Sequence, residues 1–147
     1  MKVLLIGGGG REHALAWKMA QSPLCEDLYI APGNPGTALV GTNVAIGVSD
    51  FPAIKAFVNE HKIDTVVVGP EQPLVEGIVE ALVETDAFVV GPNQRAAALE
   101  GSKAYSKAFM QKYGVPTAAY QEFKTGEEEK AIAYLDSMKL PIVVKAS

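Results

Sequence analysis

The sequence predicts an α/β protein built on a doubly wound parallel sheet, and three observations favour this class. Short apolar runs of strand length alternate with longer stretches whose apolar residues have helical spacing. The run at residues 63–68 contains three consecutive valines, which is typical of a central parallel strand buried on both faces. The run at residues 2–6 passes through four glycines directly into a helical stretch, which is the first half of a βαβ unit.

Composition places the chain among ordinary globular proteins. Of its 147 residues, 48% are hydrophobic and 20% are charged, which suits one domain, or one domain and part of another. The net charge of −4 and the lack of a basic run argue against a nucleic-acid partner. Because Cys25 is the single cysteine, we expect no disulfide and no cysteine-based metal site. No signal peptide or membrane-length apolar run is recognisable, so we expect a soluble, cytoplasmic protein without a membrane partner.

The glycines at residues 7–10 are the strongest indication of a binding site. They separate the strand from residues 11–20, which are strong helix formers without Gly or Pro. Backbone N–H groups at a helix start lack intrahelical partners, and the helix dipole adds positive potential there. We therefore expect Gly8, Gly9 and Gly10 to offer N–H groups to a phosphate, since no Cβ blocks its approach. A tight turn without a ligand is the alternative interpretation.

A dinucleotide site would need the pattern G-x-G-x-x-G and an acidic residue about 20 positions further on. Gly7 and Gly9 fit this pattern, but Glu12 stands at the third glycine position. The second predicted strand, residues 28–30, is followed by Ala and Pro and not by an acid. These departures count against NAD, although a nicotinamide-dependent oxidoreductase stays open as an alternative.

The loop at residues 31–37, APGNPGT, leaves the carboxyl end of the second strand. Two prolines and two glycines fix its backbone turns, and ligands of open α/β sheets bind at this end of the strands. Gly33 and Asn34 are therefore candidate ligand contacts, and a rigid connector is the equally simple alternative. Residues 43–46 then indicate a short strand, and Ser49 or Asp50 can cap the following helix.

Glu71 is the most informative residue of the central region. It follows the strand at 63–68 directly, between two prolines, where its carboxylate can accept hydrogen bonds from sugar hydroxyls. The alternative role is a negative charge that stabilises the start of the next helix. That helix is predicted over residues 74–83, and another buried strand over 87–90.

The second part of the chain indicates two helices and two further strands. Ser102 begins a helix, and Thr125 with Glu128 forms the capping-box pattern of another. Strands are predicted at 117–123 and 141–145. The inward face of the second helix is expected to comprise Ile132, Leu135 and Met138. Because no element follows the last predicted strand, we expect the chain to be incomplete.

Five blocks of the sequence, taken together, resemble the phosphoribosylamine–glycine ligases (glycinamide ribonucleotide synthetases) of the ATP-grasp superfamily. The blocks span essentially the whole chain and occur in order, which makes them more specific than a glycine motif alone. They are GGGGREHALAWK, APGNPGT, VVVGPEQPLVEGI, GPNQRAAALEGSKAYSKAFMQKYGVPTA and PIVVKAS.

The resemblance implies a Rossmann-like pre-ATP-grasp domain at residues 1–100 that binds phosphoribosylamine, followed by the start of an ATP-grasp domain at 101–147. It implies ATP-dependent ligation of glycine to 5-phosphoribosylamine in purine biosynthesis, through a glycyl phosphate. Mg²⁺ or Mn²⁺ would be required, with its ligands outside this chain, so the chain alone should be inactive. Another ATP-grasp ligase or carboxylase is the nearer alternative.

The same resemblance, added to the reasoning from loops, gives the candidate site residues; no catalytic residue is assigned. Lys103 and Lys145 match the family's ATP-binding lysines, where cationic groups offset phosphate charge. Whether Arg11, Glu12 and His13 touch a ligand or brace the loop stays open. The residues expected at the substrate are Gly8, Gly9, Gly10, Arg11, Glu12, Gly33, Asn34 and Glu71.

Overall fold

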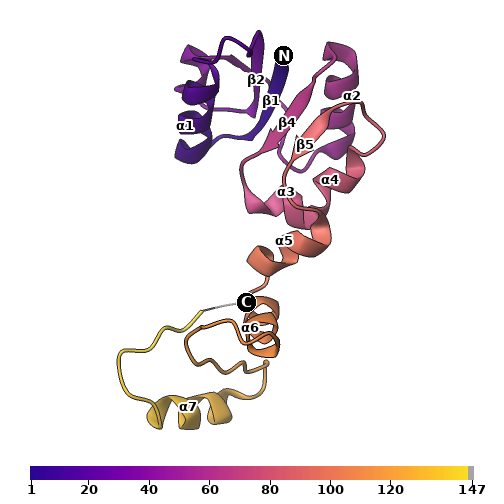
Figure 1. The fold of residues 1–147 in the computed structure, drawn as a ribbon. Helices are drawn as coiled ribbons and strands as arrows, with labels where there is room; N and C mark the ends of the chain where they lie inside the picture. The colour runs from indigo at the N-terminus through magenta and orange to yellow at the C-terminus, as the bar shows by residue number, and fades with distance from the viewer. Residues whose placement is uncertain (146–147) are drawn as a thin grey trace. The chain divides into compact units, whose positions relative to one another are not determined.

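The computed structural model describes residues 1–145, in two compact units (Figure 1). The first unit comprises residues 1–101, and the second begins at Ser102. None of the helices in the described residues is long and apolar enough to cross a membrane.

The first unit is built on a parallel sheet of five strands in the order β3-β2-β1-β4-β5, as the doubly wound prediction requires. Each strand ends at the same edge, and β1 pairs with β2 on one side and β4 on the other. The sheet strands are β1 (Lys2–Gly7), β2 (Asp27–Pro32), β3 (Thr42–Asn43), β4 (Thr65–Val68) and β5 (Phe88–Val90). The helices are α1 (Gly10–Met19), a 3-10 turn (Thr37–Leu39), α2 (Phe51–His61), α3 (Glu71–Glu76), α4 (Ile78–Ala81) and α5 (Gln94–Gly101).

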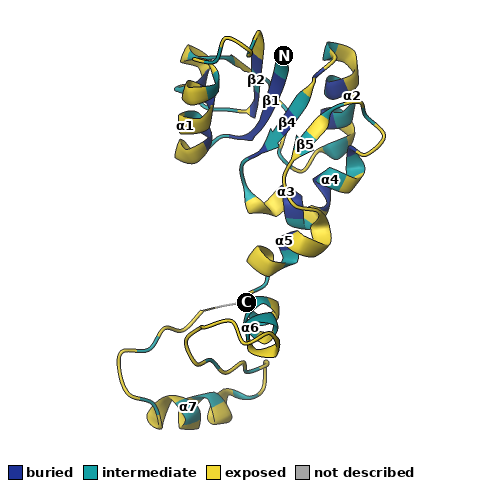
Figure 2. Cartoon of the chain, in the orientation of Figure 1, coloured by how far each residue is buried: buried dark blue, intermediate teal, exposed yellow. Residues whose placement is uncertain are grey.

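The central strand β1 separates two apolar clusters, and Figure 2 shows it as buried. Leu4 and Ile6 face the larger cluster, to which α2, α3 and α4 contribute. Leu5 faces the smaller cluster, which α1 covers through Ala16. These side chains have no exposed surface. The glycine turn therefore follows a strand that is held in place by packing on both of its faces.

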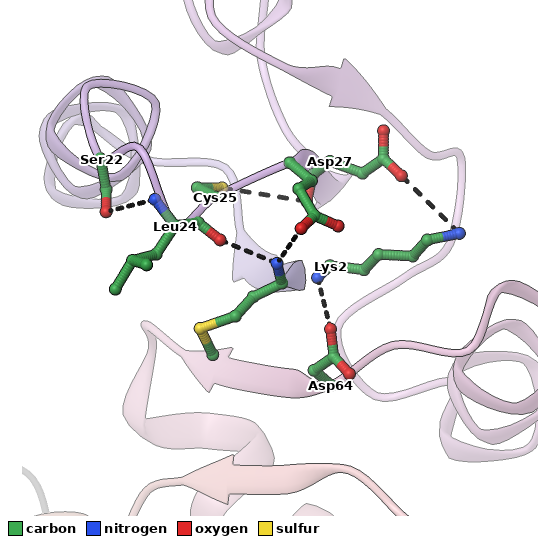
Figure 3. A network of polar contacts seen from close by, with 8 residues as sticks. Lys2, Ser22, Leu24, Cys25, Asp27 and Asp64 are labelled. Atoms are coloured by element: carbon green, nitrogen blue, oxygen red, sulfur yellow. Dashed lines mark hydrogen bonds and ion pairs between the residues drawn. The ribbon is translucent and has the colours of Figure 1, made fainter.

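The amino-terminal edge of the sheet is held by polar contacts (Figure 3). The backbone N–H of Lys2 donates to the Asp64 carboxylate over 2.6 Å, and the Lys2 ammonium lies 3.7 Å from the Asp27 carboxylate. The amino group of Met1 donates to the carbonyl of Leu24. These contacts lie at the edge of the sheet opposite to the loops that follow β1 and β4.

Two of the predicted helix starts are confirmed. The Asp50 carboxylate accepts the N–H of Ala53 over 3.2 Å and so caps α2. The Ser102 hydroxyl accepts the N–H of Tyr105 over 3.2 Å and caps α6 (Lys103–Lys112). In both cases a side-chain oxygen satisfies a backbone donor that the helix itself leaves without an acceptor.

In the first unit, the residues predicted at 74–83 are mostly helical, but the predicted bounds and the burial predicted for 87–90 were wrong. The helix begins earlier, at Glu71, and is split by Gly77, whose φ of +96° ends α3 in the left-handed region. Phe88 is 71% exposed and Val90 43% exposed, because β5 is an edge strand that pairs only with β4. Apolar runs alone do not distinguish an edge strand from a buried one.

The second unit departs further from expectation. Residues 117–123 and 141–145 are irregular and not strands, because an extended segment becomes a strand only when another strand pairs with it. The helix α7 (Glu128–Asp136) has Glu127 as its N-cap, so the predicted Thr125 capping box does not form.

The predicted inward face of α7 was also wrong, since Ile132 is 58% exposed and Leu135 37% exposed. The partly buried positions on α7 are Ala131 and Tyr134, and Met138, which was predicted to be covered, is partly buried just beyond the helix end. The ring of Tyr134 packs on that of Phe123, with 5.6 Å between their centroids. The contact with an irregular segment therefore sets which side of this helix is covered.

Limited proteolysis should cut first beyond Leu99 and leave a stable amino-terminal core. The reason is that the buried side chains of residues 1–145 lie in the first unit, whereas α6 and α7 contain none. Mass spectrometry of the resistant product measures this boundary. Rapid cleavage within residues 3–90 would contradict it.

Candidate functional site

The candidate site lies at the carboxyl ends of β1, β2 and β4, where the strand order reverses. Two hydrogen bonds extend the ladders beyond the strands: Gly33 N–H donates to the carbonyl of Gly7 over 3.1 Å, and Gly69 N–H to that of Ile6 over 3.0 Å. The loops after β2 and β4 therefore flank the glycine turn after β1. This confirms the expectation that the loops after Ile6 and Val68 face each other, as loops at a switch point do.

The glycine turn leads directly into α1, whose N-cap is Gly9. The N–H groups of Gly10 and Arg11 lie in the first turn, where a helix provides no acceptor, and they carry the positive end of its dipole. The N–H of Gly9 differs, because it donates to Glu12 Oε2 over 2.8 Å. Of the N–H groups at the helix start, Gly10 and Arg11 are thus the ones best placed for an anion.

Glu12 is a buried carboxylate beneath this turn, with 4% of its surface exposed. A Cβ built on Gly7 would lie 2.5 Å from Glu12 Cγ, and one built on Gly69 would lie equally close to it. Burial alone would raise the pKa of Glu12, but hydrogen bonds from Arg11 and Gly9 outweigh burial and leave this pKa below its usual range. Glu12 is therefore ionised at neutral pH, and its side chain packs between the loops after β1 and β4.

Arg11 connects this buried carboxylate with Glu71 at the start of α3. Its Nε donates to Glu12 Oε1 over 2.9 Å, and its Nη2 lies 3.8 Å from Glu71 Oε2. The side chains of Arg11 and Glu71 are 58% and 54% exposed, so their ion pair contributes little to stability. Both groups remain accessible to a ligand at the rim of the glycine turn.

Asn34 joins the second loop to the glycine turn. Its side-chain N–H group donates to the carbonyl of Gly8 over 3.0 Å, and its Oδ1 accepts the N–H groups of Gly36 and Thr37. Thr37 is fully buried, and its hydroxyl accepts the N–H of Asn34 over 2.7 Å. Gly33 has a φ of +73°, a conformation that favours glycine.

Sequence reasoning missed Thr37 and Asn43 as residues that shape this loop. Asn43 donates to the backbone carbonyl of Asn34 over 2.7 Å, and its Oδ1 lies 2.7 Å from the Thr37 hydroxyl. A polar residue directly after a Pro/Gly loop is the only local signal for Thr37. For Asn43 the sequence carries no such signal, because the contact depends on how the loop folds back.

The site residues described so far all belong to the first unit. Comparison with known protein families covers both units of the chain. Residues 1–100 match the N domain of phosphoribosylglycinamide synthetase, and residues 101–147 match the ATP-grasp (A) domain of the same enzyme. The chain belongs to the phosphoribosylglycinamide synthetase family. Membership of this family decides against the alternative interpretation of the chain as part of a nicotinamide-dependent oxidoreductase.

Individual relatives of the synthetase family agree with this assignment. The chain is 55% identical to a phosphoribosylamine–glycine ligase of Escherichia coli O157:H7 over 99% of its length, which is 34% of that protein. The chain thus spans about a third of the length of such relatives. The crystal structure of the phosphoribosylamine–glycine ligase of Thermotoga maritima is 34% identical, with a TM-score of 0.67 over 92% of this chain and 30% of that one.

A more distant likeness shows the fold alone. The biotin carboxylase domain of a single-chain bacterial carboxylase superposes with a TM-score of 0.63 over 92% of this chain and 34% of that one, at 16% identity. The same arrangement of strands therefore occurs in a protein of another name, so the fold by itself does not define the substrate.

The two lysines expected at ATP belong to the second unit of the chain. Lys103 is the first residue of α6, and Lys145 lies in the irregular segment that ends the described residues; both are exposed. No cluster of three His, Cys, Asp or Glu side chains within residues 1–145 is placed to hold a metal ion.

Proposed function

We propose that this chain is the ribose-phosphate-binding part of an ATP-dependent phosphoribosylamine–glycine ligase acting in the cytoplasm. Residues 1–100 would bind 5-phosphoribosylamine, and residues 101–147 would begin the ATP-binding domain. In the proposed reaction, ATP phosphorylates the glycine carboxylate, and the ribosylamine nitrogen then displaces phosphate from that glycyl phosphate to form the amide. The family match supports the reaction, and the geometry of the first unit supports the substrate site.

The observation that carries this proposal is that a helix start preceded by glycines and the carboxylate of Glu71 converge at one switch point. The N–H groups of Gly10 and Arg11 would receive the 5′-phosphate, as helix starts with preceding glycines do. Glu71, half-exposed beside Arg11, would accept hydrogen bonds from the ribose hydroxyls. Gly33 and Asn34 would close the remaining side, because Asn34 is tied to the glycine turn.

ATP is proposed to contact Lys103 and Lys145, whose ammonium groups would offset the charge of the phosphates during transfer. The requirement for Mg²⁺ or Mn²⁺ follows from the chemistry of phosphoryl transfer and not from residues of this chain.

Gly10→Ala tests the phosphate site without disturbing the protein. A Cβ added at Gly10 meets no protein atom within 4 Å, and in a helix this bond tilts toward the amino end, where the phosphate would lie. We expect unchanged or slightly higher stability and a loss of affinity for glycinamide ribonucleotide of at least ~10-fold, or ~1.4 kcal/mol. Isothermal titration calorimetry and thermal unfolding measure the two effects.

Gly47→Ala is the matched control for this variant, since a Cβ at Gly47 also meets no protein atom within 4 Å. Gly47→Ala should change neither the stability nor the affinity for glycinamide ribonucleotide. Wild-type affinity in folded Gly10→Ala would count against a phosphate at the start of α1.

A further inference from the structure

The carboxylate of Glu12 lies among three glycines that come from two different strand ends. A Cβ on Gly7 would lie 2.5 Å from Glu12 Cγ, and one on Gly9 would lie 2.9 Å from Glu12 Oε2. Gly69, more than fifty residues later, would place a Cβ 2.5 Å from both Glu12 Cγ and Oε1. The side chain therefore fills the space that these glycines leave at the junction of the loops after β1 and β4.

Glu12 also uses a hydrogen-bond donor that an anion would otherwise take. The N–H of Gly9 points to Glu12 Oε2 over 2.8 Å, whereas the N–H groups of Gly10 and Arg11 have no acceptor within their helix. A diphosphate bridging the glycine turn would need the space that the Glu12 side chain fills. It would also need further N–H donors next to those of Gly10 and Arg11.

We propose that Glu12 is the specificity-determining residue of the glycine turn: it restricts the turn to one terminal phosphate and excludes the diphosphate of a dinucleotide. This inference rests on the proposed function, because it assumes that the single phosphate binds at Gly10 and Arg11. Glu12 acts through the loop and does not itself touch the substrate.

Glu12→Ala tests the exclusion, with Glu12→Gln as a control of equal volume. Alanine removes the carboxylate and frees the N–H of Gly9, so the affinity for NADH, followed by its fluorescence, should rise at least ~10-fold. Glutamine keeps the space filled, and NADH should stay excluded. Asp64→Ala removes another carboxylate that accepts a backbone N–H, at the opposite edge of the sheet, and should leave NADH excluded as well.

Folded Glu12→Ala that still excludes NADH would overturn the inference, as would Glu12→Gln that admits it. Circular dichroism establishes which variants fold.

A measurement on the wild-type chain tests whether Glu12 occupies the Gly9 donor, and it does not depend on the folding of Glu12→Ala. In ¹⁵N NMR spectra, ribose 5-phosphate should shift the amides of Gly10 and Arg11 and protect them from exchange. The amide of Gly9, already bonded to Glu12, should keep its shift. A dominant shift at Gly9 would overturn the inference. An absence of shifts at all three amides would instead overturn the proposed phosphate site, while the NADH result would still decide whether Glu12 excludes a dinucleotide.

Discussion

Gly8→Val should fold less stably than the wild type and lose most of its affinity for glycinamide ribonucleotide. A Cβ at Gly8 would lie 2.7 Å from the carbonyl oxygen of Gly33. That oxygen belongs to backbone next to β2 and cannot turn away as a side chain can. The loop after β2 would have to move, and the hydrogen bond from Asn34 to the Gly8 carbonyl would break.

We expect Gly8→Val to lower the free energy of unfolding by ~1–3 kcal/mol, as crowding in packed regions does. Ligand affinity should fall by ~10-fold or more, because two of the three loops around the site separate. Urea unfolding and calorimetric titration measure these effects. Gly47→Val, at a position where an added Cβ meets no protein atom within 4 Å, is the control. Equal losses in both variants would show that valine, and not the contact with Gly33, causes the effect.

Glu71→Gln should retain wild-type stability but bind glycinamide ribonucleotide ~10- to 150-fold more weakly. A hydrogen bond to a charged group contributes about 1.5–3 kcal/mol, and the amide keeps the size of the carboxylate while removing its charge. The ion pair that Glu71 makes with Arg11 is exposed, so its loss changes stability little. The variant therefore separates ligand binding from folding.

The framework of this site could be predicted from sequence because each part has a local signal. The strand, the glycines and the helix that follow one another at residues 2–20 form a contiguous pattern, and Glu71 follows directly on a run of valines. The parallel arrangement then brings the carboxyl ends of such strands together. For these elements, the order of residues along the chain was sufficient to predict where they lie in the fold.

The role of Glu12 could not be predicted, because it depends on contacts between distant segments. In the sequence it is a charged residue on a helix, a type that is usually exposed. Its burial arises where Gly69 meets the glycine turn, and its charge is compensated by Arg11 and the N–H of Gly9. Only the missing third glycine of the dinucleotide pattern hinted that this position was special.

The errors in the second part of the chain concern strand pairing and one helix start. The apolar run at 141–145 has strand character, but strand formation depends on a pairing partner that no local pattern specifies. Thr125 and Glu128 have capping-box spacing, yet the N-cap is Glu127, which makes no side-chain capping bond to the helix.

The central claim is that one ribose-phosphate site lies at the carboxyl ends of β1 and β4, with Glu71 as a binding residue. It is tested most directly by calorimetric titration of glycinamide ribonucleotide into the wild type, Glu71→Gln and Glu76→Gln. Glu76, the last residue of α3, is also exposed and provides the matched control on the same helix. The account predicts a ~10- to 150-fold loss for Glu71→Gln and no change for Glu76→Gln. Wild-type affinity in folded Glu71→Gln, verified by circular dichroism, would contradict it and leave Glu71 only as a charge at the start of α3.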